Sequence, residues 1–366
     1  MDLREQVGQL FMLGFDGTSV SLDWAALQAQ YKPGGMILFS RNLEHAPQII
    51  ELTNGLQARS PHFPLLIAID QEGGRVSRLP KGFTIFPPCG LIGACRSEEL
   101  AYAAAAVTAA ELRAVGINMN MSPVLDIHSN PDNPIIGDRA YGTDPEAVAE
   151  LGVAAVRGLQ GKGVVACGKH FPGHGDTSKD SHKELPVVET SLEGLRAREL
   201  VPFQYAILNG LTTIMTAHVV YPALDAHRPA TLSPTILTGL LREQLGFAGV
   251  IVSDDLEMHA ISDHQDVGKA AVQAILAGAD LLLVCRDRTK AVSAMEAVHA
   301  AVETGTITHE RLAASVERIG AVKRRFLRSH VPADPGIAQL IVGCRTHQLL
   351  LDTITRTHAR LSRAQA

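Results

Sequence analysis

The sequence predicts an α/β protein built as a single (β/α)8 TIM barrel. Two observations predict this fold: short apolar runs alternate with longer helical patterns along most of the chain, and polar residues follow the apolar runs. Continuous apolar runs of this length are typical of strands buried on both faces of a parallel sheet. An open doubly wound sheet is the main alternative. That fold usually has GxGxxG after its first strand, and none occurs there.

The predicted barrel strands are the apolar runs Gln9–Phe15, Gly35–Ser40, Leu65–Asp70, Ile117–Ser122, Val164–Lys169, Thr213–His218, Val250–Asp254 and Asp280–Val284. The predicted helices are Glu44–Arg59, Ser97–Val115, Pro145–Gly161, Ser191–Asn209, Ser233–Leu245, Asp266–Ala277, Arg288–Glu303 and His309–Arg328. Several of these helices stop at a glycine, which is a common helix end. Strands that alternate with helices in this way indicate βα units around a barrel.

The chain after the last predicted barrel helix has a different pattern. Two prolines and a glycine in Ser329–Gly336 indicate a linker, and Ile337–Arg363 has a polar-rich helical pattern. We therefore expect a catalytic barrel over residues 1–328 and a linker with a short helical tail over residues 329–366. The role of the tail is unknown, and packing on the barrel exterior or against a partner are both open.

Composition and charge exclude several classes of protein. Hydrophobic residues make up 46% and charged residues 19%, so the chain is not disordered. The net charge of −5 gives no electrostatic case for nucleic acid or an anionic membrane as a partner. No apolar run is long enough to span a membrane, and the N-terminal segment lacks the apolar core of a signal peptide. The five cysteines form no CxxC pair, so we expect neither a disulfide framework nor a structural zinc site, and we expect a cytoplasmic protein. We also expect a monomer without cofactor or metal.

Polar residues cluster where active sites occur in TIM barrels, at and just after the carboxyl ends of the strands. These residues are Asp70, Asp126, Arg139, Lys169, His170, His218, Ser253, Asp254 and Asp255. Packing alone does not explain them, because a charged group is costly to bury without a partner. A catalytic or binding site at this end of the barrel is therefore predicted.

The richest segment is Lys169–His182, KHFPGHGDTSKDSH, and it has three interpretations. It could be an ordinary polar loop. It could be a metal site, since His170, His174, Asp176 and His182 offer nitrogen and oxygen ligands. It could be a catalytic loop in which Asp180 orients the imidazole of His182 for proton transfer.

The sequence Ser253–Asp255 offers two carboxylates at the end of one strand. Neighbouring strand residues point to opposite sides, so only one of the two is expected to face the barrel mouth. The residues alone leave the choice open, although Asp255 fits better as a cap of the next helix. A carboxylate at the mouth, together with a separate proton donor, is what a retaining glycosidase requires.

Four motifs together point to a known family. They are IDQEGGRVSR (Ile69–Arg78), IGDRAYG (Ile136–Gly142), KHFPGHGDTSKDSH (Lys169–His182) and GVIVSDDLEM (Gly249–Met258). In order and spacing the chain resembles the bacterial β-N-acetylhexosaminidases of glycoside hydrolase family three, from about residue 3 to about residue 325. The resemblance does not extend to the linker and the tail.

The resemblance implies a cytoplasmic TIM-barrel enzyme of peptidoglycan recycling. Its substrate would be a small amino sugar or muropeptide, from which it removes terminal, non-reducing, β-linked N-acetylglucosamine. The bond is typically a β-1,4 bond to anhydro-N-acetylmuramic acid, with or without a peptide. The resemblance also selects Asp254 over Asp255 as nucleophile, and it makes His182 the acid/base, assisted by Asp180.

Substrate-binding positions implied by the resemblance are Asp70, Arg78, Arg139, Lys169 and His170. An aspartate there suits sugar hydroxyls, and the cationic side chains are donors for hydroxyls and for the N-acetyl carbonyl. From the residues alone, Arg78 could instead be a surface side chain, and Arg139 could pair with Asp138 or Asp144.

Other functions fit parts of the same pattern. A divalent-metal hydrolase would use the histidines and Asp176 of the loop, and a non-catalytic sugar-binding barrel would use none of the acids chemically. A phosphorylase would share the fold and nucleophile but transfer the sugar to phosphate. A substrate-assisted hydrolase would use the acetamide as nucleophile, with a pair of acidic residues such as Asp254 and Asp255.

Overall fold

The structure is a computed structural model, and it describes residues 1–178, 180–181, 185–328 and 331–365. Within these residues eight parallel strands close into a barrel in the order β1-β10-β9-β6-β5-β4-β3-β2. The strands are β1 (Phe11–Leu13), β2 (Gly35–Leu38), β3 (Leu66–Ile69), β4 (Met119–Asn120), β5 (Val165–Phe171), β6 (Thr213–Thr216), β9 (Val250–Asp255) and β10 (Leu281–Val284). The predicted (β/α)8 barrel is confirmed, and each predicted apolar run overlaps one strand, although β5 and β9 extend past their runs by one or two residues.

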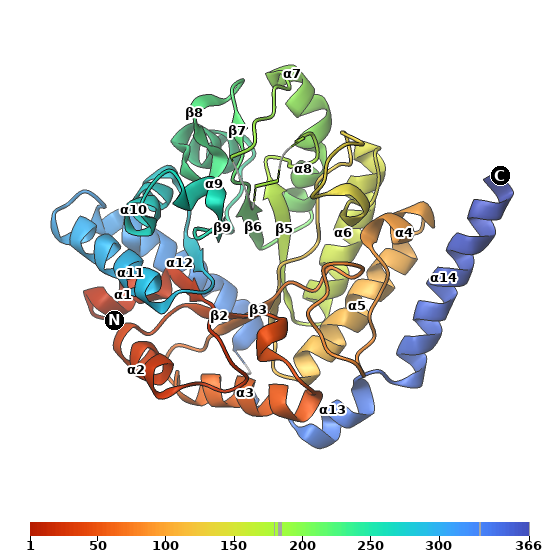
Figure 1. Cartoon of the computed structure of the whole chain (residues 1–366), viewed down its shortest axis with the longest axis horizontal. Helices are drawn as coiled ribbons and strands as arrows, with labels where there is room; N and C mark the ends of the chain where they lie inside the picture. Colours follow the sequence, from red (N-terminus) through yellow and green to blue (C-terminus); the bar gives the residue numbers. More distant parts are fainter. Residues whose placement is uncertain (179, 182–184, 329–330, 366) are drawn as a thin grey trace.

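Helices surround the barrel, as Figure 1 shows. Their bounds are α1 (Leu3–Gln9), α2 (Leu22–Tyr31), α3 (Ala46–Ala58), α4 (Cys89–Ala94), α5 (Glu98–Ala114), α6 (Pro145–Gly161), α7 (Leu192–Gly194), α8 (Val201–Leu208), α9 (His259–Ser262), α10 (Val267–Ala277), α11 (Arg288–Glu303) and α12 (His309–Leu327). Side-chain oxygens begin several of them: Ser97 accepts from the backbone N–H of Leu100, and Asp144 accepts from that of Ala147.

Several elements differ from the predicted pattern. Helix α2 and the antiparallel hairpin of β7 (Val220–Tyr221) and β8 (Asp225–Pro229) were not predicted. Strand β8 is largely exposed and has no apolar alternation, so periodicity could not reveal it. The predicted helix Ser233–Leu245 has wider π-helical turns over Thr235–Gln244, although its position is right.

The tail consists of two helices, α13 (Pro335–Ile341) and α14 (Arg345–Gln365), where one helical pattern was predicted. The break falls at Gly343, whose φ of 60° is left-handed and stops a helix. Helix α13 packs on α3 and α5, while α14 packs on α4 and α5. Figure 1 shows that the C-terminal end of α14 points away from the barrel. Among the described residues, no helix has the length and apolar character needed to cross a membrane.

Candidate active site

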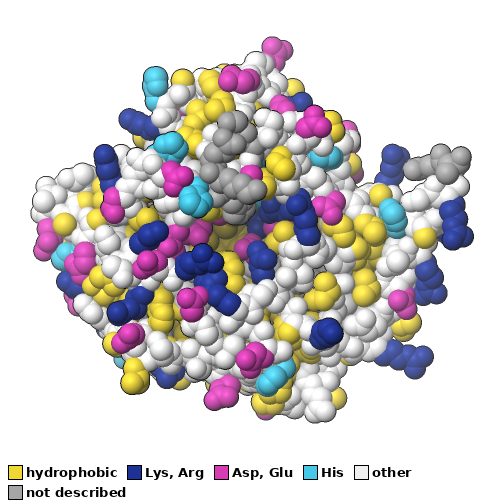
Figure 2. Space-filling model, viewed as in Figure 1, with side chains coloured by type: hydrophobic (Ala, Val, Ile, Leu, Met, Phe, Trp, Pro, Cys, Tyr) yellow, Lys and Arg dark blue, Asp and Glu magenta, His cyan; other side chains and the backbone are white. Residues whose placement is uncertain are grey.

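A pocket of about 370 Å³ lies at the carboxyl ends of the barrel strands. This volume is in the range of small-molecule sites. Its wall comes from strand ends and the loops after them: Asp70 follows β3, Lys169 and His170 lie near the end of β5, and Asp254 is the last residue but one of β9. Figure 2 shows cationic and acidic side chains gathered around the hollow near the centre of this face. The pocket therefore lies where the sequence predicted a site, at the carboxyl ends of the barrel strands.

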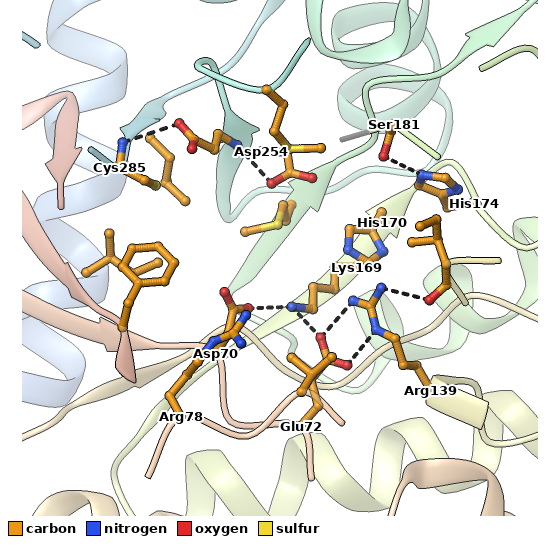
Figure 3. Close-up of a pocket in the computed structure, with 18 of the residues that line it drawn as sticks. Asp70, Glu72, Arg78, Arg139, Lys169, His170, His174, Ser181, Asp254 and Cys285 are labelled. Atoms are coloured by element: carbon orange, nitrogen blue, oxygen red, sulfur yellow. Dashed lines mark hydrogen bonds and ion pairs between the residues drawn. The ribbon is translucent and has the colours of Figure 1, made fainter. Parts of the chain in front are cut away.

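Two carboxylates and two cations form a buried cluster on one wall of the pocket. The Lys169 ammonium lies 2.6 Å from Asp70 Oδ1 and 2.7 Å from Glu72 Oε1. Arg139 donates from Nε and Nη2 to the two oxygens of Glu72, both at 2.8 Å. A bidentate pair of this kind fixes the plane of the guanidinium. Glu72 therefore holds both cations in place, as Figure 3 shows.

The cluster stays fully charged although it is buried. Burial on its own would raise the pKa of Glu72, but the charges of Lys169 and Arg139 outweigh it and hold that pKa well below its usual range. Burial likewise would lower the pKa of Lys169, but Asp70 and Glu72 raise it above its usual value. These side chains therefore present fixed cationic donors to a ligand, and Asp70 remains partly open as an acceptor.

Asp254 lies on the wall opposite this cluster (Figure 3). Its Oδ1 accepts a hydrogen bond of 2.8 Å from the backbone N–H of Asp255, which fixes one carboxylate oxygen. The Asp255 side chain serves another purpose, because its Oδ1 accepts from the backbone N–H groups of Glu257 and Cys285. The expectation that Asp255 caps the next helix is wrong, since Met258 precedes α9 and gives it no side-chain cap.

Burial and the nearby acids raise the pKa of Asp255 to about 7. A carboxyl group that is protonated over much of the acidic range is a poor nucleophile there. Of the two neighbouring acids, Asp254 is therefore the better suited to attack a sugar.

His170 faces the pocket and is held by Asp126. Its Nδ1 lies 2.6 Å from Asp126 Oδ2, and its backbone N–H donates to Asp126 Oδ1 at 3.1 Å. Asp126 is fully buried, and the charge and hydrogen bond of His170 lower its pKa despite burial. The other ring nitrogen, Nε2, is thus left for a ligand.

Arg78 also lines the pocket, and its guanidinium has no hydrogen-bond partner among the described residues. Its Nε is buried and unsatisfied, which indicates that a ligand is needed to complete its contacts. The alternative that Arg78 is an ordinary surface residue is therefore wrong. Arg139 pairs with Glu72, so the alternative pairing with Asp138 or Asp144 is also wrong.

The acid/base segment is described only in part. His182 lies outside the described residues, Asp180 is half-buried, and Ser181 lines the pocket. The side chain of Ser181 lies 3.0 Å from Nε2 of the buried His174. The structure therefore brings Ser181, next to Asp180, to the same pocket as Asp254 and Lys169.

The loop groups considered as metal ligands have other partners. Both ring nitrogens of His174 are engaged by hydroxyls, and Asp176 accepts from Arg198 and Thr190. Within the described ranges no group of three His, Cys, Asp or Glu side chains is placed to hold a metal ion. His218 is also outside the pocket wall: its ring bonds Thr231 and the carbonyl of Asp255, which joins β6 to β9.

Two residues that build the site were not predicted to belong to it. Glu72 lies within the motif of Ile69–Arg78, and Asp126 was noted only as following the fourth strand. The feature of the sequence that could have pointed to them is a carboxylate that comes soon after a predicted strand. Their role depends on partners far away in the sequence: Asp126 pairs with His170, 44 residues on, and Glu72 pairs with Arg139, 67 residues on.

Comparison with known proteins agrees with this geometry. The profile described as the glycosyl hydrolase family 3 N-terminal domain matches residues 2–322. The chain belongs to glycosyl hydrolase family three. The resemblance inferred from the four motifs is thereby confirmed at the level of the family, and the chain is a glycoside hydrolase.

Individual relatives give the same result. A protein named β-hexosaminidase from Nitrosomonas eutropha is 40% identical over 330 residues, which is 87% of this chain and 94% of that protein. The solved structure of a family 3 β-N-acetylglucosaminidase from Paenibacillus sp. is 46% identical with a TM-score of 0.94, and the match covers 98% of this chain and 69% of that one. A solved β-glucoside phosphorylase is more distant, at 28% identity and a TM-score of 0.88, with 97% of this chain and 64% of that chain covered.

Proposed function

We propose that this glycoside hydrolase is a retaining β-N-acetylhexosaminidase that removes terminal, non-reducing N-acetylglucosamine through a covalent glycosyl–Asp254 intermediate. The observation that supports it most is that Asp254 faces the donor cluster of Lys169 and Arg139 across a pocket sized for one sugar ring. The names of the relatives from Nitrosomonas and Paenibacillus support the same sugar specificity.

In this mechanism Asp254 attacks the anomeric carbon and the glycosidic bond breaks. The backbone N–H of Asp255 binds Oδ1 of Asp254 and so orients the carboxylate that forms the new bond. We assign the proton that the departing oxygen needs to His182, with Asp180 as its orienting carboxylate. In the second step the same imidazole takes a proton from water, which then releases the sugar from Asp254.

The sugar itself would be held by the buried cluster. Asp70 accepts from hydroxyls, while the donors for hydroxyls or the acetamide oxygen are Arg78, Arg139, Lys169 and His170. Since the cluster is already fixed by Glu72, little ordering is required when the substrate binds. A substrate-assisted route is less well supported, because Asp255 is engaged by backbone N–H groups and cannot readily orient an acetamide.

Trapping tests the intermediate. Incubation with a dinitrophenyl 2-deoxy-2-fluoro-β-glucoside, in which fluorine replaces the acetamide, followed by mass spectrometry, should show an adduct on the peptide that contains Asp254. Asp254→Asn should reduce turnover of an aryl N-acetyl-β-glucosaminide by a factor on the order of 10³ or more. Asp263→Asn, an exposed residue on the other side of α9, is the matched control. An unlabelled Asp254 peptide under turnover would count against the covalent mechanism.

We further propose that the leaving group is the muramic acid part of a peptidoglycan fragment. Arg286 supports this choice: it is exposed, lines the pocket, and its guanidinium has no partner in the part of the chain that the structure describes. The neighbouring Arg41 is already bound to Asp16 and to the carbonyls of Phe15 and Cys285. Arg286 is therefore the cation available for a carboxylate on the leaving group.

The leaving-group proposal predicts a charge-specific effect. Arg286→Gln should raise KM several-fold for a muramic acid disaccharide, whose leaving group has a carboxylate, and leave KM for chitobiose unchanged. Arg288→Gln is the control, since Arg288 lies outside this pocket. Equal KM changes for both disaccharides would contradict the proposal that Arg286 binds the carboxylate of the leaving group.

A separate experiment distinguishes a hydrolase from a phosphorylase: the products of the reaction are compared with and without phosphate.

A cytoplasmic location and a monomeric state complete the proposal. All five cysteines are free, as expected for a protein of a reducing compartment. Cell fractionation and sedimentation of the purified protein test these two points.

A further inference from the structure

His174 is a buried histidine that neither the sugar contacts nor the nucleophile uses. It is 2% exposed, and its ring lies between Thr177 and Ser181, with 3.0 Å from Nδ1 to Thr177 Oγ1 and 3.0 Å from Nε2 to Ser181 Oγ. Ser181 is also 2% exposed and stands between Asp180 and His182 in the sequence. The ring of His174 is thus joined directly to the middle of the proposed acid/base pair.

The hydrogen-bond directions follow from Thr177. Its oxygen accepts from Asn133 Nδ2 at 3.1 Å and its proton can go to the carbonyl of His174 at 3.2 Å, and in this arrangement the oxygen also accepts from Nδ1–H of the ring. Nδ1 therefore holds the proton, and Nε2 accepts from the hydroxyl of Ser181. Burial and the charge of His170 lower the pKa of His174 to about 4, so the ring is neutral near pH 7 and keeps this arrangement.

The other end of His174 is fixed to the substrate pocket. Its backbone N–H donates to Asp126 Oδ1 at 2.7 Å, and the second oxygen of Asp126 binds His170. Asn133 holds the same turn by donating to the carbonyls of His174 and Gly175. One buried carboxylate thus connects a pocket histidine to the segment that contains Ser181.

We propose that His174 is a positioning residue for the acid/base segment: through Ser181 it holds this segment, next to Asp180, at the pocket. The inference rests on the proposed function, because it assumes that Asp180 and His182 transfer the proton. A small displacement of a general acid costs much of its effect, since proton transfer requires hydrogen-bond distance. Nucleophilic attack by Asp254 does not depend on this link.

The role predicts a dependence on the leaving group. In Ser181→Ala we expect kcat/KM for phenyl N-acetyl-β-glucosaminide, a poor leaving group that needs an acid, to fall roughly ten- to hundredfold. The dinitrophenyl substrate needs no acid, so its kcat/KM should change less than about threefold. The kcat for the dinitrophenyl substrate should fall, because hydrolysis of the glycosyl enzyme needs the general base, and azide, which needs no base, should restore it.

Two substitutions of His174 separate the two ring contacts. His174→Gln places an amide oxygen near the position of Nε2 and can still accept from Ser181, so it should retain the activity on phenyl substrate better. His174→Asn reaches only the position of Nδ1 and Thr177, so it should show the leaving-group dependence of Ser181→Ala. Ser129→Ala is the matched control, because it removes a hydroxyl bonded to Glu199 in a neighbouring loop.

The possible results distinguish the two proposals. If wild type does not turn over either aryl substrate, the proposed function itself fails. If wild type is active and Ser181→Ala loses both substrates in equal proportion, or loses neither, the positioning role is wrong. Thermal melts of every variant ensure that a fall in rate is measured on folded protein, and a variant that melts early is replaced by the remaining His174 substitution.

Discussion

Glu72 shows how a single residue can govern a site without being the group that reacts. It is buried and bound by both Lys169 and Arg139, so its charge offsets two cations that would otherwise be costly to bury. Both of these cations are proposed to bind the sugar. The stability of the protein and the binding of its substrate are therefore linked through one carboxylate.

We expect Glu72→Gln to destabilise the protein by about 3–5 kcal/mol, because the change leaves buried cations with an incomplete set of partners. KM for the aryl substrate should rise as well, since Lys169 and Arg139 lose their fixed positions. Urea denaturation and steady-state kinetics measure the two effects. Glu317→Gln is the control: its ion pair with Arg324 is exposed on both sides and should contribute less than about 1 kcal/mol. Similar losses in the two variants would contradict this account of Glu72.

The sequence predicted most of the side chains that face the pocket, and it did so for a physical reason. Asp70, Lys169 and Asp254 come at strand ends, and a closed barrel brings those ends together whatever the loops do. The partner of Arg139 could not be predicted in the same way. Its choice of Glu72 over Asp138 depends on loop paths between distant strands, which no local pattern encodes.

At the scale of elements, prediction succeeded where burial sets the pattern. Strands β2 and β3 are apolar throughout because both faces are covered, and each was predicted to within about two residues at either end. The hairpin of β7 and β8 and the short α4 have no such pattern, because contacts with other elements stabilise them. The division into a barrel of residues 1–328 and a tail of residues 329–366 remains a prediction.

The tail helix α14 is joined to the elements that lie beneath the pocket loops. Ile354 is fully buried against α4 and α5, in a cluster that includes Cys89 and Cys95. The thiol of Cys89 contacts the carbonyl of Glu72, and Glu111 of α5 accepts from His347 of α14 and from Thr84. The tail therefore supports the helices on which the loop of Glu72 rests.

Ile354→Ala should cost about 2–4 kcal/mol in the free energy of unfolding, because it leaves a cavity in a closed cluster. Leu349→Ala is the control on the same helix: Leu349 is 47% exposed, so its truncation should cost well under 1 kcal/mol. Urea denaturation measures both. Equal and small losses would show that α14 contributes little to the fold.

At the scale of the whole molecule, two buried groups at different places change the free energy of unfolding with pH in opposite directions. Burial raises the pKa of Asp255 to about 7 from its ordinary 3.8, and burial lowers the pKa of Lys323 to about 7 from its ordinary 10.5. Gln9 is the hydrogen-bond partner of the Lys323 ammonium, and among the residues that the structure describes no carboxylate charge opposes the effect of burial. Each group is therefore most favourable to the fold when it is neutral.

Taken alone, these two shifts give a contribution to stability that is lowest near neutral pH, while the lowered pKa of His174 opposes the Asp255 part between about pH 4 and 6.5. Between about pH 4 and 7 the unfolded chain has already lost the Asp255 proton that the folded protein keeps, so stability falls as pH rises. Between about pH 7 and 10.5 the unfolded chain keeps the Lys323 proton that the folded protein has lost, so stability rises again. Glu72 and Asp126 have lowered pKa values, so their contribution is lost only in more acidic solution.

Removing each group should flatten one side of this curve. Lys323→Met should gain stability relative to wild type as the pH falls from about 10 to 7, and Asp255→Asn should gain it as the pH rises from about 4 to 7. Urea denaturation across this range at constant ionic strength measures the differences, with the exposed Lys269→Met as control. The test is how the difference in the free energy of unfolding between variant and wild type changes with pH. A constant difference is not informative, because the loss of the Gln9 contact shifts the Lys323→Met curve by the same amount at every pH. A Lys323→Met difference that does not change with pH would mean that this ammonium remains charged in the folded protein, and that the polar surroundings of Gln9 compensate for its burial.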